Sequence, residues 1–480
     1  MRRFLYSILV LVAVLCLSDC RKDKGLTIYG NYPNEVGKIM VLKCATSGCH
    51  NDASYKAAAD LNLTTWETLF QGSNSGSPVI PYRSDFSSLC YFINTYPELG
   101  PINVPTMPQG KAKLSKEEVQ TIKSWIDAGA PDFKGNVKWA DNPSRKKVYL
   151  ANQGCDVVTV IDAETQLPMR YITVGKDPGT IEVPHMIKVS PDEQYWYVIF
   201  TNASMMQKFR CSDDSYVGEA YLGPFFDWNT FVISDDGTRA YCVSWVFSGR
   251  IASVDLTQMK LINNYGGYYF PHGVALNSTN DTLYVTGQTG NYLYKLDTSL
   301  ATTQTISLNG LPPSNASSLD PHEILLSPDK QSFYITCQTS NEVRVLDIAS
   351  QSVGHVINVG TYPVEMSISD SKNKLYVTCM EDVTSFGGTS HGTVSEIDLA
   401  SYSEKRIAVG FMPHGIVVDD SRNLIYVSSR NLLTAGPPPH HSSVCYGRNG
   451  FISFIDLGTF TLKNKRIEVS VDPYSAALRK

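Results

Sequence analysis

The sequence lacks an excess of basic residues. Its 480 residues include 41 Lys and Arg against 46 Asp and Glu, which gives a formal net charge of −5 at pH 7. Proteins that bind nucleic acid usually present a basic patch or stripe, so no nucleic-acid partner is expected. No P-loop, dinucleotide-binding fingerprint or Ser-His-Asp arrangement stands out either, so the enzyme families that depend on them are not indicated.

The sequence also lacks the cysteine density of a disulfide scaffold, and it has no long apolar run after its first residues. Eleven cysteines in 480 residues do not make a small disulfide-stabilised scaffold. Cys337 and Cys379 occupy matching places in two of the repeats described below, and we expect them to be buried strand residues. Beyond residue 20 no run of 18 or more apolar residues occurs, so no transmembrane helix is predicted.

Residues 1–20 are predicted to be an export signal. Arg2 and Arg3 precede the apolar run FLYSILVLVAVLCL, which is short for a membrane span. The run ends in LSDC, which resembles the lipobox of bacterial lipoproteins, although Asp19 replaces the small residue usual there. That resemblance implies lipidation of Cys20 and a membrane anchor, and a plain secretory signal is the alternative. Both interpretations place the mature protein outside the cytoplasm, in the periplasm or at the cell surface.

Residues 21–132 are predicted to form a small helical domain, followed by a linker at 133–142. The segment NEVGKIMVLKC has helical spacing, and LSKEEVQTIKSWIDAGAP begins with a capping box of Ser115 and Glu118. The apolar residues of the second helix form one stripe, which indicates a helix packed on a core. These residues are Val119, Ile122, Trp125 and Ile126.

The motif CATSGCH, residues 44–50, follows the first of these helices. It places Cys44 and Cys49 beside His50, but four residues separate the two cysteines, whereas haem attachment usually has two. Haem attachment is the interpretation we favour. A Cys44–Cys49 disulfide and a zinc site that uses Cys90 are the alternatives.

A first helix that ends in a Cys-Cys-His motif, a loop with "MP" and a last helix that ends in WIDAGAP resemble class I cytochrome c domains. The resemblance covers about residues 33–131. It implies thioether bonds from Cys44 and Cys49 to haem c, with His50 and Met107 as the two axial ligands of the iron.

From residue 143 to residue 480 the chain repeats one pattern. Seven versions of a strand such as YVTG or YVTC recur, each followed by two further strands and preceded by a shorter one. Four strands repeated seven times predict a mainly β fold with a seven-bladed propeller. The repeats resemble the YVTN family of propellers. The last segment, DPYSAALRK, matches an innermost strand and is expected to complete the first blade, which closes the ring.

Histidines are concentrated on one face of the predicted propeller. Seven of its eight histidines map to that face, and the exception is His355. Four are expected at the mouth of the central channel because they begin innermost strands, and three lie on loops of the same face. The channel-mouth set is His185, His272, His322 and His414, and the loop set is His391, His440 and His441.

Imidazole is a common ligand of transition metals, so these seven residues are a candidate site for copper or another transition metal. A propeller with channel-mouth histidines is distantly similar to that of nitrous oxide reductases, which bind a copper cluster. The alternatives are imidazoles that only bond to the backbone and a site for an organic ligand.

Three functions compete on these observations. The first is an exported haem c electron-transfer protein whose propeller carries a substrate or metal site. The second is an exported copper oxidoreductase that acts on a small molecule, and the third is a non-enzymatic surface binding protein. The haem motif favours the first, with a redox protein or a small molecule as the unidentified partner.

Overall fold

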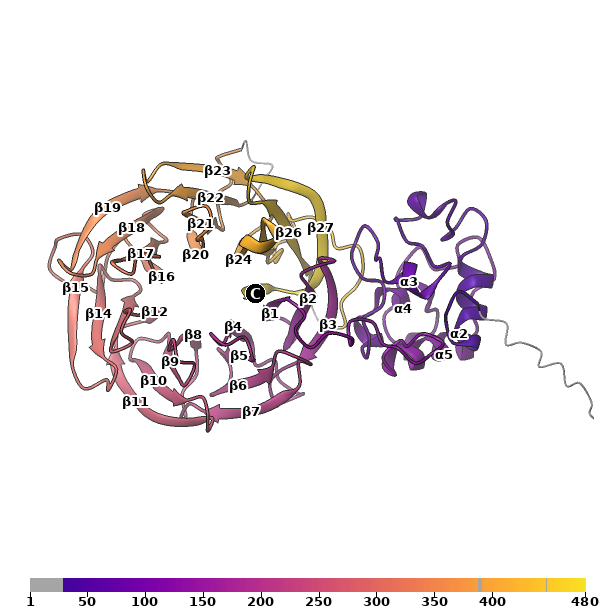
Figure 1. Ribbon diagram of the computed structural model, residues 1–480, viewed down its shortest axis with the longest axis horizontal. Helices are drawn as coiled ribbons and strands as arrows, with labels where there is room; N and C mark the ends of the chain where they lie inside the picture. Colours follow the sequence, from indigo (N-terminus) through magenta and orange to yellow (C-terminus); the bar gives the residue numbers. More distant parts are fainter. Residues whose placement is uncertain (1–28, 387–390, 446) are drawn as a thin grey trace, which may run out of the picture.

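The computed structural model describes residues 29–386, 391–445 and 447–480. A ring of strands forms the larger part, and an N-terminal region of short helices, residues 29–142, lies beside it (Figure 1). The predicted signal, with Cys20, lies outside the described residues. Among the helices that are described, none combines the length and the apolar character that a membrane span requires.

The ring is a propeller of seven four-stranded antiparallel sheets, as the repeats predict. The inner and second strands of the blades, from the first blade to the seventh, are β28 Pro473–Arg479 with β1 Lys147–Asn152, β4 Pro184–Val189 with β5 Tyr195–Phe200, β8 Trp228–Ile233 with β9 Arg239–Ser244, β12 Pro271–Leu276 with β13 Thr282–Gly287, β16 Pro321–Leu326 with β17 Ser332–Cys337, β20 Pro363–Ser369 with β21 Lys374–Cys379, and β24 Pro413–Asp419 with β25 Leu424–Ser429.

The third and outermost strands complete the blades toward the rim of the ring. In the same order they are β2 Val157–Asp162 with β3 Leu167–Thr173, β6 Met205–Arg210 with β7 Tyr216–Tyr221, β10 Gly249–Asp255 with β11 Lys260–Tyr268, β14 Tyr292–Asp297 with β15 Thr303–Ser307, β18 Glu342–Asp347 with β19 Ser352–Asn358, β22 Thr393–Asp398 with β23 Glu404–Ala408, and β26 Asn449–Asp456 with β27 Thr461–Val471.

The C-terminal strand closes the ring as predicted. β28 pairs antiparallel with β1, so that Lys147 lies opposite Arg479 and Tyr149 opposite Ala477. The first blade therefore takes its inner strand from the end of the chain, which leaves no unpaired inner edge there.

The second strand of each blade is apolar because neighbouring blades cover both of its faces. All six residues of β1, and all six of β25, are buried. Cys337 and Cys379 end such strands and are fully buried, as predicted. The outermost strands face solvent, and β19 is exposed at most of its positions.

Every inner strand begins after a residue in the left-handed backbone conformation. None of these seven residues is glycine, and their φ angles lie between 40° and 62°. Such a conformation costs roughly 1–2 kcal/mol for a non-glycine residue. The same backbone turn therefore precedes all seven inner strands, so that equivalent residues of these strands lie at the same end of the channel. The residues are Val183, Asp227, Phe270, Asp320, Tyr362, Met412 and Asp472.

The N-terminal region contains short helices around its own apolar core. Helix α5 begins at the predicted capping box, in which Ser115 Oγ accepts from Glu118 N and the Glu118 side chain accepts from Ser115 N. Its predicted apolar stripe is buried. A cytochrome c-like domain stays a prediction, because short helices alone do not identify that fold. The helices are α2 Asn34–Ile39, a π-helical turn Met40–Cys44, α3 Trp66–Leu69, α4 Ser88–Ile93 and α5 Lys116–Asp127, with 3₁₀ turns at Tyr55–Ala57, Ser84–Phe86 and Pro97–Leu99 in this region and at Asp420–Arg422 in the propeller.

The N-terminal region packs on the outer strands of the first and seventh blades. Ser77 Oγ donates to Pro168 O on β3 at 2.6 Å, and Glu468 N on β27 donates to Ser75 O at 3.2 Å. Phe70 and Trp139, both buried, join the same apolar cluster as Leu167 of β3. Figure 1 shows the helices beside β2, β3 and β27, where these contacts join the two parts.

Candidate functional site

The N-terminal region encloses a cavity of about 400 Å³. Cys44, Cys49, His50 and Met107 all line it, although Met107 is remote from the others in sequence. Much of the rest of the wall is apolar and includes Leu61, Leu63, Pro78, Leu89, Phe92 and Ile93. The size is in the usual range for a small-molecule or cofactor pocket, and a few polar groups converge on it.

The chain between the two cysteines forms a compact turn. The π-helical turn ends at Cys44, where Ala45 N donates to Met40 O. His50 N then donates to Cys44 O at 3.3 Å, which places the histidine backbone beside the first cysteine. The longer spacing is thus accommodated by leaving the helix at Cys44.

The His50 imidazole is oriented by the backbone. Its Nδ1 lies 3.1 Å from Leu61 O, and because a carbonyl oxygen only accepts, Nδ1 is the protonated nitrogen of the neutral imidazole. This is the arrangement usual for a metal-binding histidine. Burial lowers the pKa of His50, which favours the neutral imidazole that ligation requires.

Both cysteines of the motif are free thiols, so the structure does not form the alternative disulfide. Burial and the nearby Cys49 raise the pKa of Cys44 to about 12. Cys90 is buried but does not line the cavity. Within residues 29–386, 391–445 and 447–480, no three or more His, Cys, Asp or Glu side chains are placed to hold a metal ion, which gives the zinc alternative no support.

Met107 is distant from the cysteine motif in the sequence, but a contact with helix α4 places it at the same cavity. Its backbone N donates to Phe92 O at 2.7 Å. Lys111, further along the same segment, donates from Nζ to Thr46 Oγ1 at 2.6 Å, which ties the methionine segment to the cysteine turn. The geometry therefore fits the donor set of a haem c site, with two thiols, an oriented imidazole and a thioether around one largely apolar cavity.

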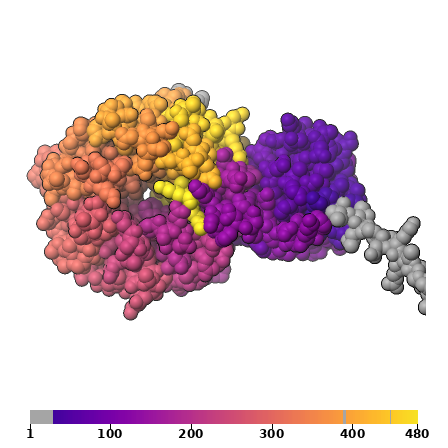
Figure 2. All heavy atoms as spheres, in the orientation of Figure 1, coloured from indigo at the N-terminus to yellow at the C-terminus, as the bar shows by residue number. Residues whose placement is uncertain are grey.

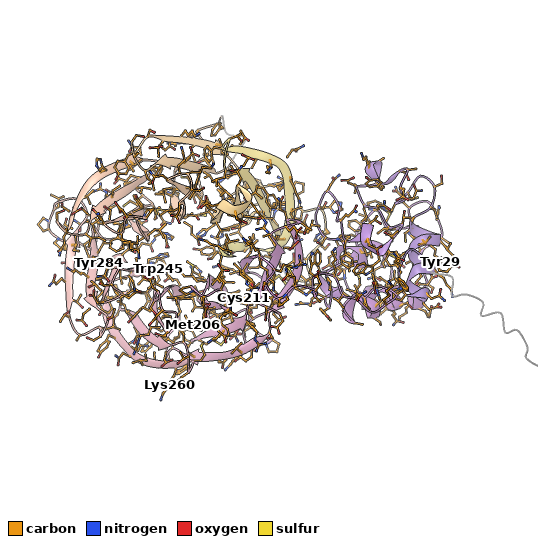
Figure 3. All side chains as sticks on the ribbon, in the orientation of Figure 1. Tyr29, Met206, Cys211, Trp245, Lys260 and Tyr284 are labelled. Atoms are coloured by element: carbon orange, nitrogen blue, oxygen red, sulfur yellow. A yellow bond between two sulfur atoms is a disulfide. The ribbon has the colours of Figure 1, made fainter. Side chains whose placement is uncertain are left out.

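A second cavity, of about 360 Å³, lies at the mouth of the propeller channel, where the inner strands begin. Figure 2 shows the central hollow of the ring from one side. The second residue of every inner strand lines it, which follows from the repeated left-handed turn. The structure thus brings together the four predicted channel-mouth histidines. The seven residues are His185, Asn229, His272, His322, Val364, His414 and Tyr474. Figure 3 shows Trp245, which also lines this cavity, toward the centre of the ring, and Lys260 at its outer margin.

The rings at the mouth are in close contact at tilted angles. The centroids of His272 and His322 are 3.8 Å apart, and Tyr474 lies 3.6 Å from His414 and 4.2 Å from His185. Burial lowers the pKa of all four histidines, to about 3 for His272. The imidazoles are therefore neutral near pH 7.

Several buried polar atoms at the mouth have no hydrogen-bond partner among the described residues. They include Nδ1 of His272, His322 and His414. Unsatisfied buried polar atoms are rare in folded proteins because each costs roughly 1–3 kcal/mol. Their concentration around one cavity indicates a place where a ligand or ordered water completes the hydrogen bonding.

Two buried carboxyl groups beneath these rings were not identified from the sequence. Burial raises the pKa of Glu323 to about 7 and that of Glu365 to about 8. Glu365 Oε1 lies 3.5 Å from His414 Nδ1. Each comes directly after the channel-mouth residue of its inner strand. The alignment of the repeats could therefore have identified both from the sequence.

The loop histidines do not line the channel-mouth cavity. His391 packs on Phe411, with ring centroids 4.4 Å apart. His440 lines the cavity of the N-terminal region, and His441 contacts Glu468. Copper binding by the seven histidines stays a prediction, and among the described residues these imidazoles do not form a group of three or more side chains placed to hold a metal ion.

Sequence reasoning also missed the disulfide between Cys155 and Cys445. It joins the turn between β1 and β2 to the loop after β25. The cysteines are 290 positions apart and stand in unrelated motifs. Only the closure of the ring brings the first and seventh blades together, so spacing alone carried no signal.

No family model matches the chain, and no curated protein matches it. Solved structures of similar fold include the following two. Hydrazine synthase from Kuenenia stuttgartiensis has a TM-score of 0.50 and 15% identity, and the match covers 63% of this chain and 93% of that one. A functionally unknown protein from Desulfotomaculum acetoxidans has a TM-score of 0.52 and 12% identity, with 69% and 98% covered. At these identities the likeness shows the fold alone.

Proposed function

We propose that this chain is an exported haem c electron-transfer protein whose propeller carries a ligand site at the channel mouth. The observation that carries the proposal is the convergence of Cys44, Cys49, His50 and Met107 on one cavity. The sequence resemblance and the geometry support it independently, because Met107 was selected by its loop motif and not by its position in space.

Each residue has a role that its surroundings suit. The Cys44 and Cys49 thiols would hold haem through two thioether bonds, formed by addition of S and H across its two vinyl groups, which needs no oxidant. His50, oriented by Leu61 O, and Met107 would be the ligands of its iron. The apolar side chains that make up much of the cavity wall suit the apolar haem ring. Bound haem supplies reversible one-electron transfer, and a thioether ligand raises its potential.

The channel mouth is the place where the propeller would bind a small molecule. The unpartnered imidazole nitrogens and the protonatable Glu323 and Glu365 favour a polar ligand that both donates and accepts hydrogen bonds. Copper is the alternative ligand of the same imidazoles. Export and lipid anchoring belong to the same proposal, since covalent haem c and a lipoprotein signal both imply maturation outside the cytoplasm.

The proposal is tested by haem attachment in matched cysteine variants. The wild type, Cys49→Ser and Cys90→Ala are produced with cytochrome c maturation machinery, then denatured and extracted with acidified organic solvent. We expect the wild type and Cys90→Ala to keep their haem through the extraction. Cys49→Ser should hold its haem more weakly, through the single thioether bond of Cys44. A colourless wild type refutes the proposal.

A further inference from the structure

The loop that follows β25, residues 430–445, connects the propeller to the cavity of the N-terminal region. Ser442 Oγ donates to Asn103 Oδ1 at 2.7 Å. The rings of His440 and Phe92 have centroids 5.2 Å apart. Since Phe92 O accepts from Met107 N, the loop contacts the segment that positions the methionine.

The propeller holds this loop firmly in place. Cys445 is bonded to Cys155 of the first blade. Glu468 on β27 is buried, and its carboxylate accepts from His440 N at 2.7 Å and from His441 N at 3.4 Å. Asn431 Nδ2 donates to Pro437 O at 3.1 Å. The position of His440 is therefore built by a disulfide, a buried carboxylate and an internal amide contact.

The two neighbouring histidines differ in what their rings do. His441 Nε2 lies 3.4 Å from Glu468 Oε1, and its Nδ1 lies 2.9 Å from Ser442 O, so both nitrogens have partners. The His440 ring lines the cavity and makes no hydrogen bond to any residue that the structure describes. The His441 imidazole thus stabilises the loop, whereas the His440 imidazole is available to bind a ligand in the cavity.

We propose that His440 completes the haem site from the propeller, by donating a hydrogen bond to a carboxylate of the haem. The inference rests on the proposed function. Phe92, which packs on the His440 ring, and Met107 are apolar side chains that cannot bond to a carboxylate, whereas Lys43 and Gln109 also line the cavity and offer further donors. Haem is apolar except for its two propionates, and these belong at the open edge of a pocket. His440 is the exposed residue that the propeller places at that edge.

A consequence for the potential follows from charge. A carboxylate near the iron stabilises the ferric state, and a hydrogen bond to that carboxylate offsets part of its charge. Loss of the donor should therefore lower the reduction potential, which outer-shell hydrogen bonds are known to tune.

The test measures the reduction potential and visible spectrum of full-length protein with haem attached. His440→Leu removes the donor, and His440→Gln keeps an N–H donor. His355→Leu is the matched control, because this histidine lies on outer strand β19 and packs on Tyr402. We expect a lower potential for His440→Leu, a value nearer the wild type for His440→Gln, and no change for His355→Leu, with the same low-spin spectrum throughout.

The outcomes separate this inference from the proposed function. A wild type without covalent haem overturns both. A wild type with haem whose potential is unchanged by His440→Leu overturns the inference alone. Loss of the low-spin spectrum in His440→Leu also overturns it, because His440 would then be a ligand of the iron. Cys155→Ser, which frees the loop from the first blade, should shift the potential in the same direction as His440→Leu.

Discussion

Replacement of Glu365 by glutamine should make the stability of the propeller less sensitive to alkaline pH. Glu365 is 7% exposed beneath the channel mouth, and burial raises its pKa from an ordinary 4.5 to about 8. The folded state therefore holds this proton more tightly than the unfolded state. The stability that protonated Glu365 contributes is fully present below pH 4.5 and is lost as pH rises through about 8.

The magnitude follows from the two pKa values. The free energy of unfolding of the wild type falls by about 1.4 kcal/mol for each pH unit between 4.5 and about 8. The total loss is about 5 kcal/mol relative to a protein whose side chain at this position stays neutral. Entry of water into the cavity reduces this figure, so it is an upper limit. Glu365→Gln keeps the shape and the neutral state. It should match the wild type within about 1 kcal/mol at pH 5 and be more stable at pH 9 by as much as about 5 kcal/mol.

The assay is denaturant unfolding of the full-length protein at pH 5 and pH 9, with midpoints and slopes compared. Glu164→Gln is the control, because that side chain is 78% exposed and should behave alike at both pH values. An equal difference between Glu365→Gln and the wild type at the two pH values would refute the reasoning, since it would mean that Glu365 ionises in the folded state as it does in the unfolded state.

Three further predictions concern the two candidate sites and the predicted export signal. Met107→Ala should keep covalent haem, lower the reduction potential and open the sixth coordination position, which carbon monoxide binding and potentiometry would detect. Unchanged ligand binding would remove Met107 from the iron. Labelled fatty acid should enter the wild type but not Cys20→Ser, and equal labelling of both would favour a plain secretory signal. If the mouth binds copper, the His272→Ala/His322→Ala double variant should hold less than the wild type by elemental analysis. Occupancy should fall only well below pH 6.5, because burial lowers the pKa of these imidazoles and protons compete for them only in more acidic solution. Equal metal content beyond the haem iron would leave these imidazoles with a non-metal role.

The propeller could be predicted from the sequence because its repeats are local. Each blade carries the same apolar strand, and the matching of DPYSAALRK to an inner strand predicted the pairing of β28 with β1. The repeat register also located His185, His272, His322 and His414 at one mouth, because equivalent positions in a ring converge. The left-handed residue before each inner strand was not predicted, since none of the seven is glycine.

Contacts between blades and between the two parts could not be predicted in this way. The loop histidines were assigned to the channel face, but the docking of the N-terminal region places His440 against Phe92 instead. The Cys155–Cys445 disulfide depends on the same tertiary arrangement. Such contacts arise from packing between distant segments, and periodicity within one segment carries no information about them.

Haem on the cysteine turn is the central claim, and peptide mass measurement tests it most directly. Trypsin should cut after Lys43 and Lys56, which releases the fragment of residues 44–56 with Cys44, Cys49 and His50. For wild-type protein matured with the cytochrome c machinery, the account predicts that this fragment carries the mass of one haem bound through both cysteines. A fragment without haem, with free thiols or a Cys44–Cys49 disulfide, would contradict it.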